Sequence, residues 1–121
     1  MGNKTDYRDA FHTELRSFMK NLCKTFDDDH ELMMMTSSLL IAISDDPEDK
    51  VITNYRDTVL PHKALVDARD ATFFYKINNT EYKLMSQLHL YWERLNAADQ
   101  KVVWDYIQVL LALSIKVLPL V

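Results

Sequence analysis

The scarcity of glycine is the sequence feature that most limits how this chain can fold. One glycine and three prolines occur among 121 residues. Sheet-rich domains need tight turns at short intervals, and those turns favour glycine, proline, asparagine and aspartate. The chain is therefore expected to form helices joined by short polar loops. The same scarcity excludes the glycine-rich loops that cradle phosphates in P-loop and dinucleotide-binding proteins.

The length predicts one domain, residues 1–121, because domains typically span about 100–200 residues. A chain of this size buries roughly two-thirds of its unfolded surface, which is enough for a core without metal or disulfide cross-links. Residues 109–121 are apolar apart from Ser114 and Lys116. This apolar end is expected either to dock onto the domain or to continue into a longer protein, of which 1–121 is then the N-terminal part.

Large apolar residues recur three or four positions apart, which is the spacing of one helix face. The first such stripe consists of Tyr7, Phe11, Leu15, Phe18, Leu22 and Phe26. Further helices are predicted over 32–43, 47–60 and 81–95. The expected N-caps, which accept hydrogen bonds from the first free amides of a helix, are polar residues before these segments. They lie within 27–29 and at Asp46 (with Pro47 in the first helical position), Thr80 and Asn96.

The last predicted helix is the longest. It runs from Ala97 to about Leu118, roughly 33 Å at the helical rise, and its apolar stripe is wide enough for a buried axial helix. Residues 62–79 fit either short helices or extended chain. Together the patterns predict an all-α, single-domain, irregular bundle of five to six helices with a long buried C-terminal helix. Charged residues in the last helix argue against a membrane span.

The net charge of −4 argues against nucleic-acid binding, because phosphate neutralisation needs a basic surface. The acidity is local: residues 26–50 contain eight acidic residues and one basic residue, a net charge of −7. The acidic blocks 27–31 and 45–49 lack the alternation and central glycine of a calcium-binding EF-hand loop. They are interpreted as solvated helix starts, and whether they also meet a basic partner is left open.

No pattern for catalysis, cofactor binding or metal binding is found. The four histidines are never three or four residues apart, and the single Cys23 is expected to be a buried thiol in a reducing compartment. The serines lack the motif of an activated nucleophile. The chain is therefore predicted not to be an enzyme, and no catalytic, cofactor-binding or metal-ligating residue is assigned.

A run of methionines, Leu32-Met33-Met34-Met35, is the most informative local motif. Methionine adapts its shape and is common on protein-binding surfaces. Three in a row cannot all face one core, so their helix is expected either to be central or to lie at an interface. Trp92 and Trp104 are expected in the core. The candidate partner-binding residues are Met33, Met34, Met35, Leu118, Leu120 and Val121.

Two segments carry a resemblance to a known group of proteins. Residues 11–22 read FHTELRSFMKNL, and residues 99–111 read DQKVVWDYIQVLL, preceded by LHLYW at 88–92. This arrangement resembles uncharacterised helical proteins of large nucleocytoplasmic DNA viruses that infect algae and amoebae. The resemblance implies an intracellular setting, namely the host cytoplasm, the virus factory or the virion. It implies no activity and no catalytic residue.

The sequence thus predicts a non-enzymatic protein–protein interaction or assembly module, viral in origin, that binds a protein partner or itself through apolar helix faces. The alternative is a nucleic-acid-associated viral factor that uses the basic face of the first helix. That face consists of Arg8, Arg16, Lys20 and Lys24.

Overall fold

The computed structural model describes residues 4–46, 48–77 and 82–118, and every regular element in these ranges is a helix. Five helices are ten residues or longer, and two are short. In chain order the elements are α1 (Lys4–Thr25), α2 (His30–Ser44), α3 (Lys50–Val59), the 3-10 turn η1 (Leu60–His62), α4 (Lys63–Asp67), α5 (Phe73–Lys76), α6 (Lys83–Trp92) and α7 (Ala97–Val117). The predicted all-α fold is confirmed.

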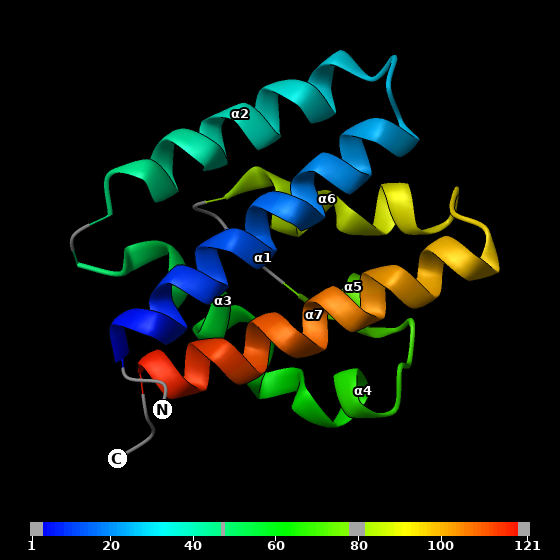
Figure 1. Cartoon of the computed structure of the whole chain (residues 1–121). Helices are drawn as coiled ribbons and strands as arrows, with labels where there is room; N and C mark the ends of the chain where they lie inside the picture. Colours follow the sequence, from blue (N-terminus) through cyan, green and yellow to red (C-terminus); the bar gives the residue numbers. More distant parts are fainter. Residues whose placement is uncertain (1–3, 47, 78–81, 119–121) are drawn as a thin grey trace.

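Helix α7 is the axis of the bundle, as predicted. It lies antiparallel to α1, and its C-terminal turn is beside the N-terminal turn of α1 (Figure 1). On its other side, the buried Tyr55 hydroxyl of α3 donates a hydrogen bond to the Ile107 carbonyl at 2.8 Å. Leu110 and Val117 are fully buried. Several helices pack on α7 and bury most of its apolar side chains. Such burial is the main favourable contribution to folding.

Aromatic side chains from α5, α6 and α7 form a second part of the core, beside the contacts of α7 with α1 and α3. The Phe74 ring stacks on Trp92 with 4.4 Å between ring centroids, and Trp104 lies 5.1 Å from Phe74 and 5.3 Å from Trp92. Both tryptophans are buried, as predicted. Phe74 belongs to the undecided stretch 62–79, whose described part forms η1, α4 and α5. These elements are too short to show a helical period. Their buried side chains are Val66 in α4 and Phe73 and Phe74 in α5.

Two of the predicted N-caps are confirmed. The third, Asp46, also binds the first amides of its helix, but that helix begins later in the chain than predicted. The Asp29 carboxylate accepts from the Leu32 amide, and the Asn96 side chain accepts from the Asp99 amide. The Asp46 carboxylate accepts from the amides of Lys50 and Val51 at 2.8 and 3.0 Å. The prediction that α3 begins at residue 47 is wrong: the helix begins at Lys50. Pro47 and Thr80 lie outside the described residues.

Helix α2 is not the central, mostly buried helix that was one of the two expectations. It packs on α1 and α6 at the periphery (Figure 1). Only one of its faces is buried, and that face consists of Leu32, Met35, Thr36, Leu39 and Ile43. Cys23 is half-buried rather than fully buried, and its Sγ lies 3.2 Å from the Thr36 hydroxyl. Among the described residues, no helix is long and apolar enough to cross a membrane.

The axial role of α7 predicts a large loss of stability for Leu110→Ala. Because Leu110 is fully buried, truncation should lower the free energy of unfolding by about 2–5 kcal/mol. Urea denaturation measures this change. The matched control is Leu90→Ala on α6, where the side chain is 51% exposed, and its effect should stay within about 0.5 kcal/mol. Equal losses for the two variants would contradict the packing described here.

His12 predicts a pH dependence of stability. Its Nε2 atom is buried without a hydrogen-bond partner among the described residues. Burial, and secondarily Arg16, lowers the pKa of His12 below its usual value of about 6.5. The unfolded chain then binds a proton more readily than the folded one, so stability should fall as the pH drops from about 7 towards the lower folded pKa. Thermal melts of wild type and His12→Gln check this, and the variant should lose that part of the pH dependence.

Candidate functional site

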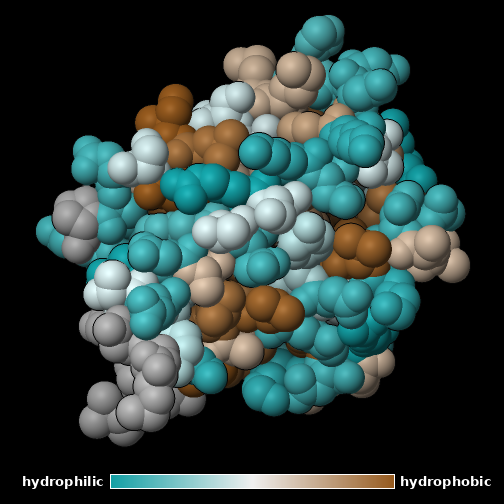
Figure 2. Space-filling view, in the orientation of Figure 1, coloured by the Kyte–Doolittle hydropathy of each residue, from teal (hydrophilic) through white to brown (hydrophobic). Residues whose placement is uncertain are grey.

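Exposed hydrophobic side chains gather on α2. Figure 2 shows hydrophobic residues over this helix. Among the described residues, the large hydrophobic side chains that are exposed are Met33, Met34, Ile41, Tyr75, Leu90 and Val109. Met34 and Ile41 are each 72% exposed, the most of this set, and a spacing of seven residues puts them on one side of the helix. We call Met33, Met34, Ser37, Ser38 and Ile41 the α2 face.

An apolar groove runs along the edge of this face, between α2 and the start of α6. Its volume is about 450 Å³, and its apolar lining comes from Met34, Met35, Leu39, Tyr82 and Leu84. At its rim, the Lys83 ammonium lies 3.0 Å from a Glu31 carboxylate oxygen. We call this feature the α2–α6 groove. It exists because the apolar residues of α2 surround the helix axis, and the core covers only part of them.

The structure separates the predicted contact residues. Met33 and Met34 lie on the α2 face, and Met35 is 8% exposed in the wall of the α2–α6 groove. Leu118 is elsewhere: it is half-buried after the last turn of α7, and its carbonyl accepts from Arg56 Nη1 at 2.7 Å. It therefore does not extend the methionine surface. Leu120 and Val121 lie outside the described residues.

Four apolar residues of the groove and the face were missed by the sequence interpretation. They are Leu39, Ile41, Tyr82 and Leu84. Ile41 had a signal, since it is seven residues after Met34 and therefore on the same side of the helix. Leu39 had a similar signal, since it is four residues after Met35. Tyr82 and Leu84 had none, because their position depends on how α6 packs against α2.

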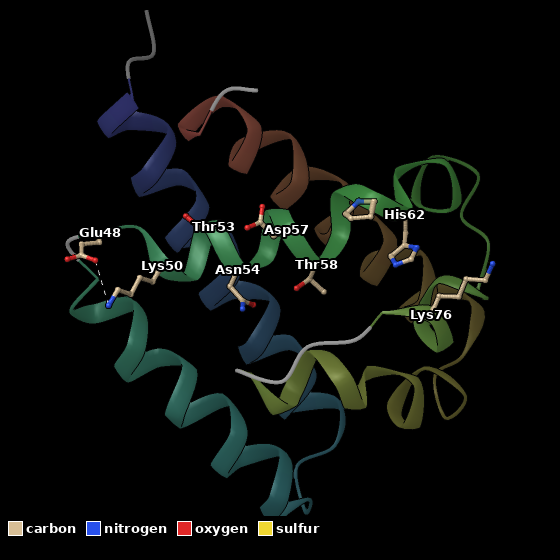
Figure 3. A pocket seen from close by; sticks show the side chains of 9 residues that line it. Glu48, Lys50, Thr53, Asn54, Asp57, Thr58, His62 and Lys76 are labelled. Atoms are coloured by element: carbon tan, nitrogen blue, oxygen red, sulfur yellow. Dashed lines mark ion pairs between the residues drawn. The ribbon is translucent and has the colours of Figure 1, made fainter. Parts of the chain in front are cut away.

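A larger polar depression lies along α3 (Figure 3). It is open to solvent, encloses about 800 Å³, and is lined by Glu48, Lys50, Thr53, Asn54, Asp57, Thr58, Pro61, His62 and Lys76. Lys50 pairs with Glu48 at 3.7 Å at one end, whereas His62 and Lys76 lie at the other end. The labelled side chains come from α3 and from neighbouring segments, and they point in different directions (Figure 3). The lining combines carboxylates, ammonium groups, hydroxyls and one imidazole in an open depression.

Three of the shifted pKa values have their cause in contacts within the fold. Burial raises the pKa of Tyr55, whose hydroxyl is bound to the α7 backbone. Burial also raises the pKa of Tyr91 to about 12. The Arg69 guanidinium, 2.6 Å from Asp105, lowers the pKa of that carboxyl. No group of three histidine, cysteine, aspartate or glutamate side chains in the described ranges is placed to hold a metal ion.

One of the four cations on the predicted basic face of α1 forms an ion pair within the fold. Arg8 donates two hydrogen bonds to the buried Asp49 carboxylate, at 2.6 and 2.8 Å. This pair ties the start of α1 to the start of α3. Lys20 and Lys24 are exposed and Arg16 is half-buried. The nucleic-acid alternative therefore rests on three cations on an acidic chain, and no described feature favours it over the α2 face.

Comparisons with known proteins add no assignment. No protein-family model matches the chain, and neither the curated proteins nor the solved structures give a significant match.

The two sides of α2 differ in exposure, so substitutions on them should differ in their effect on stability. Met34→Ser combined with Ile41→Ser removes only exposed side chains, so the free energy of unfolding should change by no more than about 0.5 kcal/mol. Leu39→Ala, on the buried side of the same helix, should cost about 2–5 kcal/mol. Chemical denaturation measures both. A large loss in the Met34/Ile41 double variant would mean that the α2 face is part of the core.

Proposed function

We propose that this chain is a non-enzymatic helical module that binds another protein through the α2 face and the α2–α6 groove. The observation that carries the proposal is the joint exposure of Met33, Met34 and Ile41 on one helix beside an apolar groove. Exposed apolar surface on a stable domain costs free energy in water, and a partner that covers it recovers that free energy.

The chemistry of the surface supports a protein as the partner. Methionine side chains are flexible and polarizable, so they repack against differently shaped apolar partners. An apolar groove of this kind can bind an amphipathic helix, whose apolar side chains enter at intervals of three and four residues. Ser37 and Ser38 sit between Met34 and Ile41 and supply hydroxyl groups for the polar contacts of such an interface.

The resemblance to proteins of large nucleocytoplasmic DNA viruses supports a viral setting for this module. We propose that it acts in the host cytoplasm, in the virus factory or in the virion.

Site-specific photo-crosslinking in infected cells tests the proposed function. A photoreactive amino acid at Ser38, on the α2 face, should form one discrete adduct with a partner protein or a second copy of the chain. The same probe at Leu90, which is also exposed, serves as the matched control and should form none. Met34→Ser with Ile41→Ser should reduce the Ser38 adduct at least about tenfold, because a loss of about 1.4 kcal/mol already has that effect.

Equal crosslinking from the two positions, or an adduct at Ser38 that the double variant leaves intact, would rule out the α2 face as the binding surface. Analytical ultracentrifugation of the purified chain separates the two partner classes, since only self-association gives a dimer without other proteins.

A further inference from the structure

The two ends of the α2 face are both acidic. Asp27 and Asp28 precede the helix, and Asp45 and Glu48 follow it; all four are exposed. Helix α2 itself contains no lysine or arginine. The apolar surface is therefore enclosed, along the helix axis, by negative charge at each end.

Internal contacts neutralise only part of this charge. Of the eight acids in residues 26–50, four are engaged within the fold: Asp29 with Arg94, Glu31 with Lys83, Asp46 with the amides of Lys50 and Val51, and Asp49 with Arg8. Within the described part of the chain, Asp27, Asp28 and Asp45 make no hydrogen bond or ion pair. Glu48 reaches only Lys50, at 3.7 Å between two exposed side chains.

Asp45, at the C-terminal end of α2, has no stabilising role in this helix. Carboxylates stabilise a helix N-terminus and destabilise a helix C-terminus, because of the partial charges of the backbone. Asp27 and Asp28 therefore suit the start of α2. Asp45 is the C-cap residue of α2, and the last turn of that helix contains no basic residue. A cation from outside the chain would stabilise this end.

The charge pattern argues against a second copy of this chain as the partner. If two α2 faces packed antiparallel, Asp27 and Asp28 of each copy would meet Asp45 and Glu48 of the other. If they packed parallel, each acidic end would meet its own equivalent. Either arrangement places acid against acid at both ends, and like charges across an interface oppose association.

We propose that the occupant of the α2 face is a helix of another protein, with an apolar stripe in its middle and lysine or arginine at both ends. This inference rests on the proposed function and specifies its partner. The 15 residues of α2 span ~22 Å at the helical rise, so the two basic ends are separated by about four helical turns. Apolar side chains of the stripe enter the α2–α6 groove, and the basic ends lie against the two acidic ends.

The test uses stapled helical peptides and the whole chain, with binding measured by fluorescence anisotropy. The first peptide has leucines at positions i, i+4, i+7 and i+11 and two arginines at each end. The second has glutamates in place of the arginines, and the third keeps the arginines but has serines in place of the leucines. We expect the first peptide to bind at least about tenfold more tightly than either of the others at about 50 mM salt. The advantage over the second should shrink at about 500 mM, because salt screens exposed charges.

Two variants of the chain complete the test. The charge variant, Asp27→Asn with Asp28→Asn, Asp45→Asn and Glu48→Gln, should bind the first peptide several-fold less tightly and lose the preference for basic ends. The apolar variant, Met34→Ser with Ile41→Ser, should bind neither leucine-containing peptide, whereas Leu90→Ser should bind as wild type does. Circular dichroism checks that each variant is folded.

The outcomes distinguish this inference from the proposed function. If the two leucine-containing peptides bind equally and the apolar variant binds neither, the inference about charge is wrong and the docking surface stands. A dimer that the apolar variant abolishes has the same consequence. If no peptide binds, the inference is overturned, and a chain that is also monomeric and forms no Ser38 adduct overturns the proposed function as well.

Discussion

The burial of α7 on several sides is the constraint on which the rest of the structure depends. α1 covers one side of this helix, and α3 and α4 cover another. A hydrogen bond joins each of α3 and α4 to α7. The Tyr55 hydroxyl of α3 donates to the Ile107 carbonyl, and the Gln108 side-chain amide of α7 donates to the Val66 carbonyl of α4 at 3.1 Å. With these sides occupied, α2 packs on α1 and α6 instead. It buries one face there, and the α2 face is left in water.

The fold was predictable where a helix is long enough to show its period. Phe11, Leu15 and Leu22 on α1 are buried as their spacing indicates, and so are Leu110 and Val117 on α7. Prediction failed at short elements and at boundaries. α5 has four residues, less than two turns, so its period cannot be read. The start of α3 was misplaced because Asp46 caps from four residues before the helix, with Asp49 between them in the left-handed conformation at φ 56°.

The candidate site was predictable in part. The methionine run correctly indicated more apolar residues than one core-facing stripe can use, and Met33 and Met34 are exposed. The sequence gives no information on which side of α2 the core would take, because apolar residues surround the axis. That choice is made by packing against α1 and α6, and the groove residues from α6 follow from it. The acidic blocks were visible in the sequence, but which carboxylates keep an uncompensated charge depends on ion pairs such as Arg8 with Asp49.

Methionine oxidation, followed by mass spectrometry, tests the central claim most directly. Hydrogen peroxide converts accessible methionine to the sulfoxide and reaches buried methionine slowly. In the free native chain, Met33 and Met34 should oxidise at least about tenfold faster than Met19, Met35 and Met85, which are at most 9% exposed, since buried side chains react only when the structure opens. The central claim is that the core is complete while the α2 face stays exposed to solvent. Equal oxidation rates at all five methionines, or protection of Met34 in the free chain, would contradict it.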